Sequence, residues 1–198
     1  MSDTYISESA LIHESSIIGR NVRIWHNAKI REKVILGENI VIGDSVYIGP
    51  EVRIGKNSKI QNCAQIYEPA IISEGVFIGP GVIITNDHNP RAINVDKSQK
   101  SGLDWNKSGV EINEGASIGA GAICVGPIEI GAWAMIGAGA VVVDSVLSYA
   151  LVVGVPAKQI GYVGKAGIKL VEITPTSFRF PDTNRLYKLN GINLVEEI

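Results

Sequence analysis

Aliphatic residues recur every six positions along most of this 198-residue chain. An unbroken run of thirteen reaches Ile84, and the spacing resumes at Ile112, an offset of 28 that is not a multiple of six. The first run is Ile12, Ile18, Ile24, Ile30, Leu36, Ile42, Ile48, Ile54, Ile60, Ile66, Ile72, Ile78 and Ile84, and the second is Ile112, Ile118, Cys124, Ile130, Ile136 and Val142. The pattern predicts two runs of one repeat separated by an irregular insertion.

Other columns of the repeat are also restricted. The residue after the aliphatic is often glycine, and the residue four after it is small or β-branched. The residue three after it is Asn or Gly in nine of the repeats: Asn21, Asn27, Asn39, Asn57, Gly75, Gly81, Gly115, Gly121 and Gly139. Since Asn and Gly tolerate a positive φ, this column predicts a tight turn in every repeat.

A turn every six residues excludes long helices and long strands. It predicts an all-β parallel helix, in which three short strands make one 18-residue coil of a triangular prism and successive coils stack roughly 4.8 Å apart. The first run, 12–84, would form about four coils and the second, 112–147, two more, so about six in all. A narrow prism leaves little room for aromatic side chains, which make up only 6% of the chain.

The repeat divides the chain into two parts. Residues 1–167 are predicted to form the β-helix domain, with a long, polar, aperiodic loop at 85–109 of the kind that is usually functional or disordered. Residues 168–198 alternate apolar and polar positions around turns at 182–184 and 190–191, which predicts a small β-hairpin appendage. It could cap the open sheet edges of the last coil.

Composition excludes several classes of protein. The net charge of −2 gives no support for a nucleic-acid partner. Cys63 and Cys124 are too far apart for a zinc ribbon and too few for a disulfide framework. The N-terminal residues show no signal peptide, and no apolar stretch is long enough to cross a bilayer. We therefore expect a soluble cytoplasmic protein without a membrane partner.

Candidate chemistry gathers where the loop leaves the repeat. Residues 18 apart should stack, so Glu68 is expected to lie against Asn86. His88 is the only histidine in the loop and could act as a general base, because imidazole titrates near neutral pH, or it could be an ordinary loop residue. Arg91 could contact a phosphate or carboxylate, or could satisfy loop carbonyls. Three successive repeats carry side chains in the column that is often glycine: Gln61, Tyr67 and Ser73.

The repeats Ile42-Gly43-Asp44-Ser45-Val46-Tyr47 and Ile48-Gly49-Pro50-Glu51-Val52-Arg53 resemble those of the hexapeptide-repeat acyltransferases. The resemblance implies a left-handed coil, against the usual right-handed crossover rule. It also implies a homotrimer with active sites between subunits. The chain departs from the family at Val146-Leu147, where Val-Pro usually follows the last repeat.

Further segments narrow the resemblance to the sugar-nucleotide 3-amino N-acetyltransferases. These segments are Phe77-Ile78-Gly79-Pro80-Gly81-Val82, Thr85-Asn86-Asp87-His88-Asn89-Pro90-Arg91-Ala92, Arg23-Ile24-Trp25-His26 and Ile60-Gln61-Asn62. The resemblance is closest to the enzymes that acetylate UDP-2-acetamido-3-amino-2,3-dideoxyglucuronate in surface-polysaccharide synthesis. It implies transfer of acetyl from acetyl-CoA to a sugar amine, with no metal.

The resemblance also implies roles for individual residues. In the resembled enzymes the Asn of Thr-Asn-x-x-x-Pro-Arg lies against the reacting amine, so Asn86 is the leading catalytic candidate. Glu68 or Asp87 could hold the proton of the amine, with His88 as a third candidate. The substrate-binding candidates are Arg91, Tyr67, Gln61, Asn62, Asp87 and His26.

Acetyl-CoA is expected along the second run. Gly119-Ala120 and Gly137-Ala138 are 18 apart, so they should stack and leave a groove for the pantetheine arm, or they could serve turn geometry alone. The family places CoA in such a groove between neighbouring subunits. Lys158 and Lys165 could meet the CoA phosphates.

Other functions stay open. Close relatives of the resembled enzymes act on dTDP-linked 3-amino-3,6-dideoxyhexoses, and a hydroxyl acceptor is the nearest alternative to an amine. A γ-type carbonic anhydrase needs three histidines on zinc, and the chain has three, His13, His26 and His88, without a short-range ligand pair. A non-catalytic scaffold is the third class, and the long polar loop argues against it.

Overall fold

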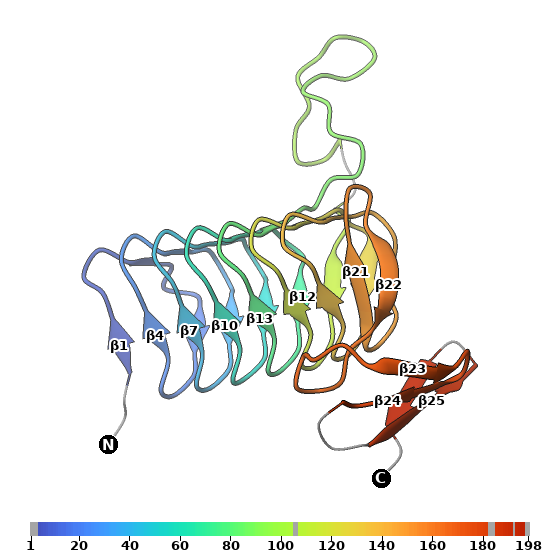
Figure 1. Cartoon of the computed structure of the whole chain (residues 1–198). Coiled ribbons are helices and arrows are strands. Elements are labelled where there is room, and N and C mark those ends of the chain that lie inside the picture. The colour runs from blue at the N-terminus through green and yellow to red at the C-terminus, as the bar shows by residue number, and fades with distance from the viewer. Residues whose placement is uncertain (1–3, 105–106, 182–184, 192, 197–198) are drawn as a thin grey trace.

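A computed structural model describes residues 4–104, 107–181, 185–191 and 193–196. In these residues the chain forms strands and turns but no helix, so no helix of the described chain could cross a membrane. The strands of successive coils stand side by side along the long axis of the molecule, and the inserted loop projects from the prism as an arm (Figure 1).

Three sheets form the walls of the prism. Sheet A has the order β1 (Tyr5–Ile6), β4 (Arg23–Ile24), β7 (Val41–Ile42), β10 (Lys59–Ile60), β13 (Phe77–Ile78), β16 (Ser117–Ile118), β19 (Met135–Ile136), β21 (Ala150–Val153) and β22 (Lys158–Tyr162). Sheet B has β2 (Leu11–Ile12), β5 (Lys29–Ile30), β8 (Tyr47–Ile48), β11 (Gln65–Ile66), β14 (Ile83–Ile84), β17 (Ile123–Cys124) and β20 (Val141–Val142). Sheet C has β3 (Ile17–Ile18), β6 (Ile35–Leu36), β9 (Arg53–Ile54), β12 (Ile71–Ile72), β15 (Val110–Ile112) and β18 (Ile128–Ile130).

Each coil passes from sheet A to B to C, and the turns between sheets form three edges. We call them the A–B edge (for example 25–28), the B–C edge (31–34) and the C–A edge (37–40). The pairing is parallel, with Tyr5 beside Arg23 in the first rung. The fold is thus the predicted parallel β-helix, and its six-residue spacing is that of the left-handed type.

The helix has about eight turns rather than about six. On sheet A the parallel rungs run from β1 to β21. The prediction counted from Ile12 to residue 147 and therefore missed the rung at each end. The last one, β21, is followed by β22, which returns antiparallel along it and covers the end of sheet A.

The predicted columns take their expected places. The aliphatic and small columns fill a continuous core, and Ile12 and Ile18 pack against it only partly buried. All nine Asn and Gly residues of the predicted turn column have positive φ, between 56° and 70°. Residues without that freedom adopt the same turn elsewhere, including Lys33, Ser45 and Trp133. The stacking of coils therefore imposes this turn whatever the side chain.

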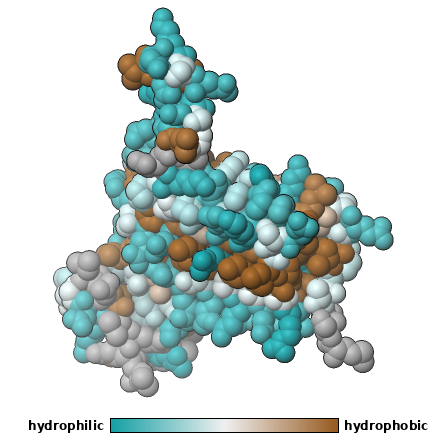
Figure 2. Space-filling view, turned by 180° about the vertical axis from the view of Figure 1, so that it is seen from behind, coloured by the Kyte–Doolittle hydropathy of each residue, from teal (hydrophilic) through white to brown (hydrophobic). Residues whose placement is uncertain are grey.

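The insertion occupies 85–109, between β14 and β15, as predicted. Its distal part is held by its own contacts, such as the antiparallel bridge between Ile93 and Gln99. Val95 and Leu103 are almost fully exposed on it. Figure 2 shows brown, apolar atoms on this arm and in patches on the body of the helix.

The C-terminal segment is larger than the predicted hairpin. It forms an antiparallel sheet of β23 (Val171–Thr174), β24 (Ser177–Arg179), β25 (Leu186–Asn190) and β26 (Asn193–Glu196). The predicted turn at 182–184 lies outside the described residues. The sheet packs around Phe178 and Tyr187, whose rings contact Tyr162 and Tyr149 of the last coil. The appendage therefore docks beside that coil, while β22 covers the strand edge of sheet A.

Candidate functional site

The loop leaves the prism at the B–C edge, directly above Glu68. Strands β11 and β14 pair with Gln65 beside Ile83 and Ile66 beside Ile84, so the same offset of 18 residues assigns Glu68 and Asn86 to equivalent positions just past these strands. The two side chains thus belong to adjacent rungs of the same edge. The Glu68 side chain is 15% exposed, and Asn86 is half-buried. A shielded carboxylate and a half-buried carboxamide therefore lie on adjacent coils at the base of the arm.

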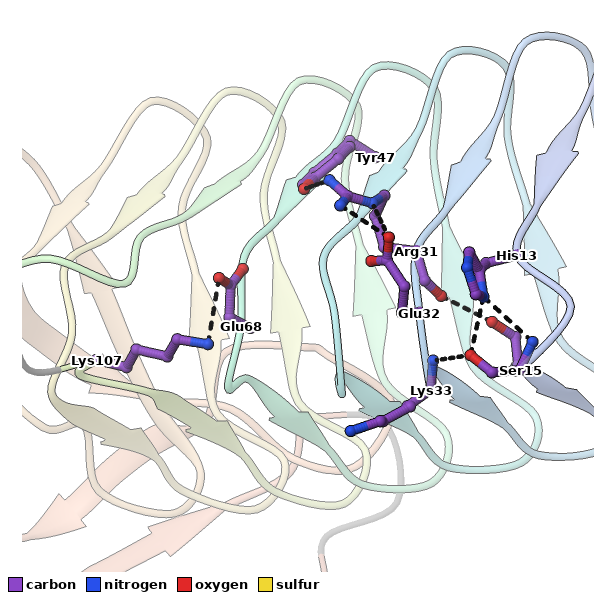
Figure 3. A network of polar contacts seen from close by, with 9 residues as sticks. His13, Ser15, Arg31, Glu32, Lys33, Tyr47, Glu68 and Lys107 are labelled. Carbon is purple, nitrogen blue, oxygen red and sulfur yellow. Dashed lines mark hydrogen bonds and ion pairs between the residues drawn. The ribbon is translucent and has the colours of Figure 1, made fainter. Parts of the chain in front are cut away.

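Glu68 has room because the coil below carries Gly49. A Cβ at position 49 would lie 2.8 Å from Glu68 Oε2, closer than real side chains approach. The other carboxylate oxygen, Oε1, lies 3.6 Å from Lys107 Nζ, which comes from the returning end of the loop (Figure 3). The Glu68 carboxylate is thus shielded on one side by the coil that carries Gly49, and on another side it faces the Lys107 ammonium.

The base of the loop is fastened to the next coil through Gly126. The Gly126 amide donates to Thr85 Oγ1 at 3.2 Å, and His88 Nδ1 lies 3.2 Å from the Gly126 carbonyl oxygen. A carbonyl can only accept, so this contact requires a hydrogen on Nδ1 and, in the neutral ring, leaves Nε2 as the acceptor. The structure therefore gives His88 an anchoring contact and leaves one ring nitrogen for chemistry.

Two polar side chains at this base keep hydrogen-bonding capacity. The Asn86 carbonyl accepts from the Ser108 amide at 3.0 Å, which ties the two ends of the loop together. Among the described residues the Asn86 carboxamide has no side-chain hydrogen bond, and the buried Ser108 hydroxyl has no partner. Asn86 is only half-buried, so its carboxamide can meet a bound polar molecule, whereas the enclosed Ser108 hydroxyl cannot.

Asp87 and Arg91 lie in the loop but make local contacts. Asp87 Oδ1 accepts from the Asn89 amide at 2.9 Å, and Arg91 Nη1 donates to the Pro90 carbonyl at 2.9 Å. Neither contact reaches Glu68. In this structure Arg91 is an exposed loop residue satisfying a loop carbonyl.

The other predicted sugar contacts lie on a different edge. His26, Gln61 and Asn62 belong to the A–B edge, where the Asp44 side chain accepts from the His26 amide at 3.1 Å and the Asn62 side chain accepts from the Asp44 amide at 3.0 Å. These bonds form a ladder along the edge, each rung 18 residues on. The structure does not bring this ladder together with Glu68 and Asn86 in one chain.

The predicted CoA groove continues along the A–B edge. A Cβ at Gly119 would lie 2.5 Å from the Ala138 amide nitrogen, so this glycine permits the close stacking of coils. The amides of Gly119 and Gly137 already donate to Ile136 and Val152 carbonyls. These glycines therefore contribute space rather than free amides, and the exposed surface there belongs to Ala120 and Ala138.

The two predicted phosphate-binding lysines lie beyond the last coil. Lys158 is exposed at the start of β22, opposite Val153. Lys165 lies over the Trp133 ring, with Nζ 5.6 Å from its centroid, a cation–π contact on the C–A side. The structure thus separates Lys165 from the A–B edge.

Sequence reasoning missed Arg31, Tyr47 and Lys107. The ring of Tyr47 lies 5.2 Å from that of Tyr67, and Arg31 Nη1 donates to the Tyr47 hydroxyl at 3.4 Å. A signal for Arg31 was present, since it occupies the often-glycine column as Tyr67 does. Lys107 had none, because the loop breaks the 18-residue period.

The three histidines lie far apart in the fold, on the B–C edge, on the A–B edge and in the loop. Within the described ranges, no three His, Cys, Asp or Glu side chains gather in a way that could hold a metal ion.

Comparison with known proteins identifies the repeat. The family model described as bacterial transferase hexapeptide (six repeats) matches residues 15–50 and 51–86. Together the two matched segments cover most of the first run of repeats. No curated protein matches the sequence significantly.

Three solved structures are similar to this chain, and the first of them, at a TM-score of 0.50, shares its fold. The acetyltransferase domain of PglB from Neisseria gonorrhoeae is 18% identical with a TM-score of 0.50, and the match covers 79% of this chain and 57% of that one. The same domain in complex with acetyl coenzyme A is 21% identical with a TM-score of 0.47, and the match covers 80% of this chain and 58% of that one. PerB from Caulobacter crescentus, in complex with CoA and GDP-perosamine, is 20% identical with a TM-score of 0.44, and the match covers 80% of this chain and 57% of that one. The chain thus spans less than two thirds of each of these structures.

Proposed function

We propose that this protein is an acetyl-CoA-dependent N-acetyltransferase. Its acceptor would be the 3-amino group of a nucleotide-linked sugar of the UDP-2-acetamido-3-amino-2,3-dideoxyglucuronate type, used in surface-polysaccharide synthesis in the cytoplasm. The observation that carries the proposal is the shielded Glu68 carboxylate one coil from Asn86, at the base of a polar loop on a helix of six-residue repeats. The fold shared with the acetyltransferase domain of PglB supports the reaction class.

The proposed chemistry needs few groups. A sugar amine is an ammonium ion at neutral pH and must lose a proton before it attacks. Glu68 would hold the ammonium and Asn86 would orient the nitrogen, because a carboxylate and a carboxamide oxygen accept its hydrogens. The first proton of the ammonium passes through Glu68 to solvent. The neutral nitrogen then attacks the thioester carbonyl carbon, the C–N bond forms, the C–S bond breaks, and the second proton lost by nitrogen ends on the CoA sulfur.

A second copy of the chain would complete the site. The proposed amine site lies on the B–C edge, and the proposed CoA groove of Ala120 and Ala138 lies on the A–B edge of the same protomer. A single prism cannot turn both edges toward one substrate. In a homotrimer the B–C edge of one subunit would face the A–B edge of its neighbour, which is why we propose three copies with sites between them.

The chemistry of Glu68 favours an amine over a hydroxyl. A carboxylate binds an ammonium ion through charge, whereas a hydroxyl must be deprotonated by a stronger base. His88 Nε2 is the group on this edge that would serve a hydroxyl acceptor. The dTDP-linked 3-amino-3,6-dideoxyhexoses differ from the proposed substrate in base and in charge, so they are tested directly.

The test is acetyl-CoA consumption by the purified protein with four acceptors: UDP- and dTDP-linked 3-amino sugars, each with and without a carboxylate on the sugar. We expect turnover that depends on the amine and is fastest with the carboxylated UDP sugar. The matching 3-hydroxy sugars serve as controls. Turnover of those alone would establish an O-acetyltransferase, and no turnover with any acceptor would contradict the proposal.

A further inference from the structure

The ion pair between Glu68 and Lys107 differs from the surface ion pairs of the prism. In five such pairs both side chains lie on one edge, and each is at least 36% exposed. Glu68 is only 15% exposed, and its partner Lys107 comes from the returning end of the arm. Because a shielded carboxylate loses part of its hydration, it needs a cation more than an exposed one does. The arm therefore brings a positive charge to the shielded carboxylate of the proposed amine site.

Both charged ends of this pair keep hydrogen-bonding capacity. Lys107 Nζ lies 3.6 Å from Glu68 Oε1, which is within ion-pair range but too far for a hydrogen bond (Figure 3). Among the residues that the structure describes, neither the Glu68 carboxylate nor the Lys107 ammonium makes a side-chain hydrogen bond. An ammonium has three N–H donors and a carboxylate has two acceptor oxygens, so both ends can bind a ligand. The Lys107 side chain is 45% exposed, which gives it room to turn toward one.

The other charges near this pair are balanced. Along the B–C edge each of the next two carboxylates has a cation within 3.3 Å: Glu51 with Lys33, and Glu32 with Arg31. Glu14 is three coils from Glu68, roughly 14 Å, which exceeds the Debye length of about 8 Å at physiological salt. In the loop, Asp87 and Arg91 contribute one charge of each sign. The electrostatic character at the base of the arm is therefore set by one carboxylate and one ammonium.

Such a pair matches a ligand that carries both charges. The proposed acceptor has its amine and its carboxylate on ring carbons separated by one other carbon, so the two groups are about 5 Å apart. At neutral pH the amine is an ammonium ion and the carboxylate is ionised, so this part of the sugar is a zwitterion. Its net charge is zero, as is that of Glu68 and Lys107 together. An ammonium at Glu68 and a carboxylate at Lys107 would replace one ion pair by two and leave no charge unpaired.

We propose that Lys107 determines specificity for a carboxylated sugar. On binding, the ammonium of the sugar takes the place of Lys107 at Glu68, and the released Lys107 ammonium binds the carboxylate of the sugar. This inference rests on the proposed function and names the residue that selects the acid-bearing acceptor over an uncharged one. A sugar with the amine but without the carboxylate displaces Lys107 from Glu68 and leaves its charge without a partner, which disfavours that sugar.

Calorimetric titration of the wild type and of Lys107→Gln with carboxylated and uncharged UDP-linked 3-amino sugars tests this role without any turnover. We expect the variant to bind the carboxylated sugar at least about tenfold more weakly, because a charge-assisted contact is lost. The uncharged sugar should bind the variant as tightly as the wild type, or more tightly. An equal loss with both sugars would overturn the proposal, since Lys107 would then bind the phosphates that they share or only support Glu68. Unchanged affinity for both sugars would overturn it too.

Lys97→Gln is the matched control, since Lys97 is an exposed lysine on the same arm. It should bind both sugars as the wild type does. Lys107→Arg keeps the charge and should keep most of the preference for the carboxylated sugar, and Lys107→Ala repeats the test should Lys107→Gln fail to fold. If the wild type prefers the carboxylated sugar through Lys107 but acetylates no acceptor, the proposed function fails alone. If the acceptors are acetylated with the same preference by Lys107→Gln, this inference fails alone.

Discussion

At the scale of single residues, Gly55 shows why one column of the repeat is so restricted. A Cβ at this position would lie 2.6 Å from the Glu74 amide nitrogen, which is backbone of the next coil and cannot move aside. We expect Gly55→Ala to lower the free energy of unfolding by about 1–3 kcal/mol, the usual cost of overpacking. Denaturant unfolding followed by circular dichroism measures it.

Gly102→Ala is the control, because a Cβ there meets nothing within 4 Å. It should leave the unfolding midpoint where it is. Equal stability of Gly55→Ala and the wild type would show that the coils do not stack as closely as described.

The two cysteines should differ in reactivity. Burial raises the pKa of the Cys124 thiol to about 12, so at pH 8 it stays protonated as well as covered, whereas Cys63 is exposed. Since the thiolate is the nucleophile, we expect one thiol to react quickly with a chromogenic disulfide in the native protein and the second only after unfolding in guanidinium. Two fast thiols in the folded protein would contradict the buried place of Cys124.

At the scale of elements, the arm is separable from the helix. Its distal residues, 92–104, contribute nothing to the buried core. We expect replacement of 92–104 by a short Gly-Ser link to keep the strand signal in circular dichroism and to change the melting temperature little, because no apolar core is lost. A protein that no longer folds would show that the arm supports the helix.

The elements were the most predictable feature of the chain. The six-residue period fixes the strands, the turn column and the bounds of the insertion at 85–109, because every coil obeys the same stacking constraint. The period did not predict the two end rungs, β1 and β21. It also gave no information on the appendage, where the prediction was a hairpin and the structure has a four-stranded sheet. Antiparallel strands after residue 168 have no repeat to count, so their number depends on packing.

The site was predictable only as far as the period reached. Glu68 and Asn86 were paired in the prediction because they are 18 residues apart. Lys107 returns to Glu68 from across the insertion, and no spacing in the sequence encodes that contact. Arg31 stands in the often-glycine column, but that signal was used only at Gln61, Tyr67 and Ser73, and Tyr47, which precedes Ile48, lies outside the column.

At the scale of the whole molecule, the account requires more than one copy. Asn86→Ala removes the proposed amine contact on the B–C edge, and Ala138→Trp fills the proposed CoA groove on the A–B edge. We expect each variant alone to lose most of its activity and their co-assembled mixture to regain activity, because some sites then combine two intact edges.

Native mass spectrometry of the same samples reports the assembly. A trimeric mass is expected for the wild type and for both variants. A mixed trimer without regained activity would place both edges of a site in one chain.

The most direct test of the central claim is the initial rate of acetyl transfer by Asn86→Ala beside that of His88→Ala, with the acceptor that the wild type uses best. Asn89→Ala makes the same chemical change in the same loop and serves as the control. The account predicts a loss of roughly 100-fold for Asn86→Ala, of the order found when one polar contact to a reacting group is removed, and most of the rate retained in the other two. A wild-type rate in Asn86→Ala would contradict it.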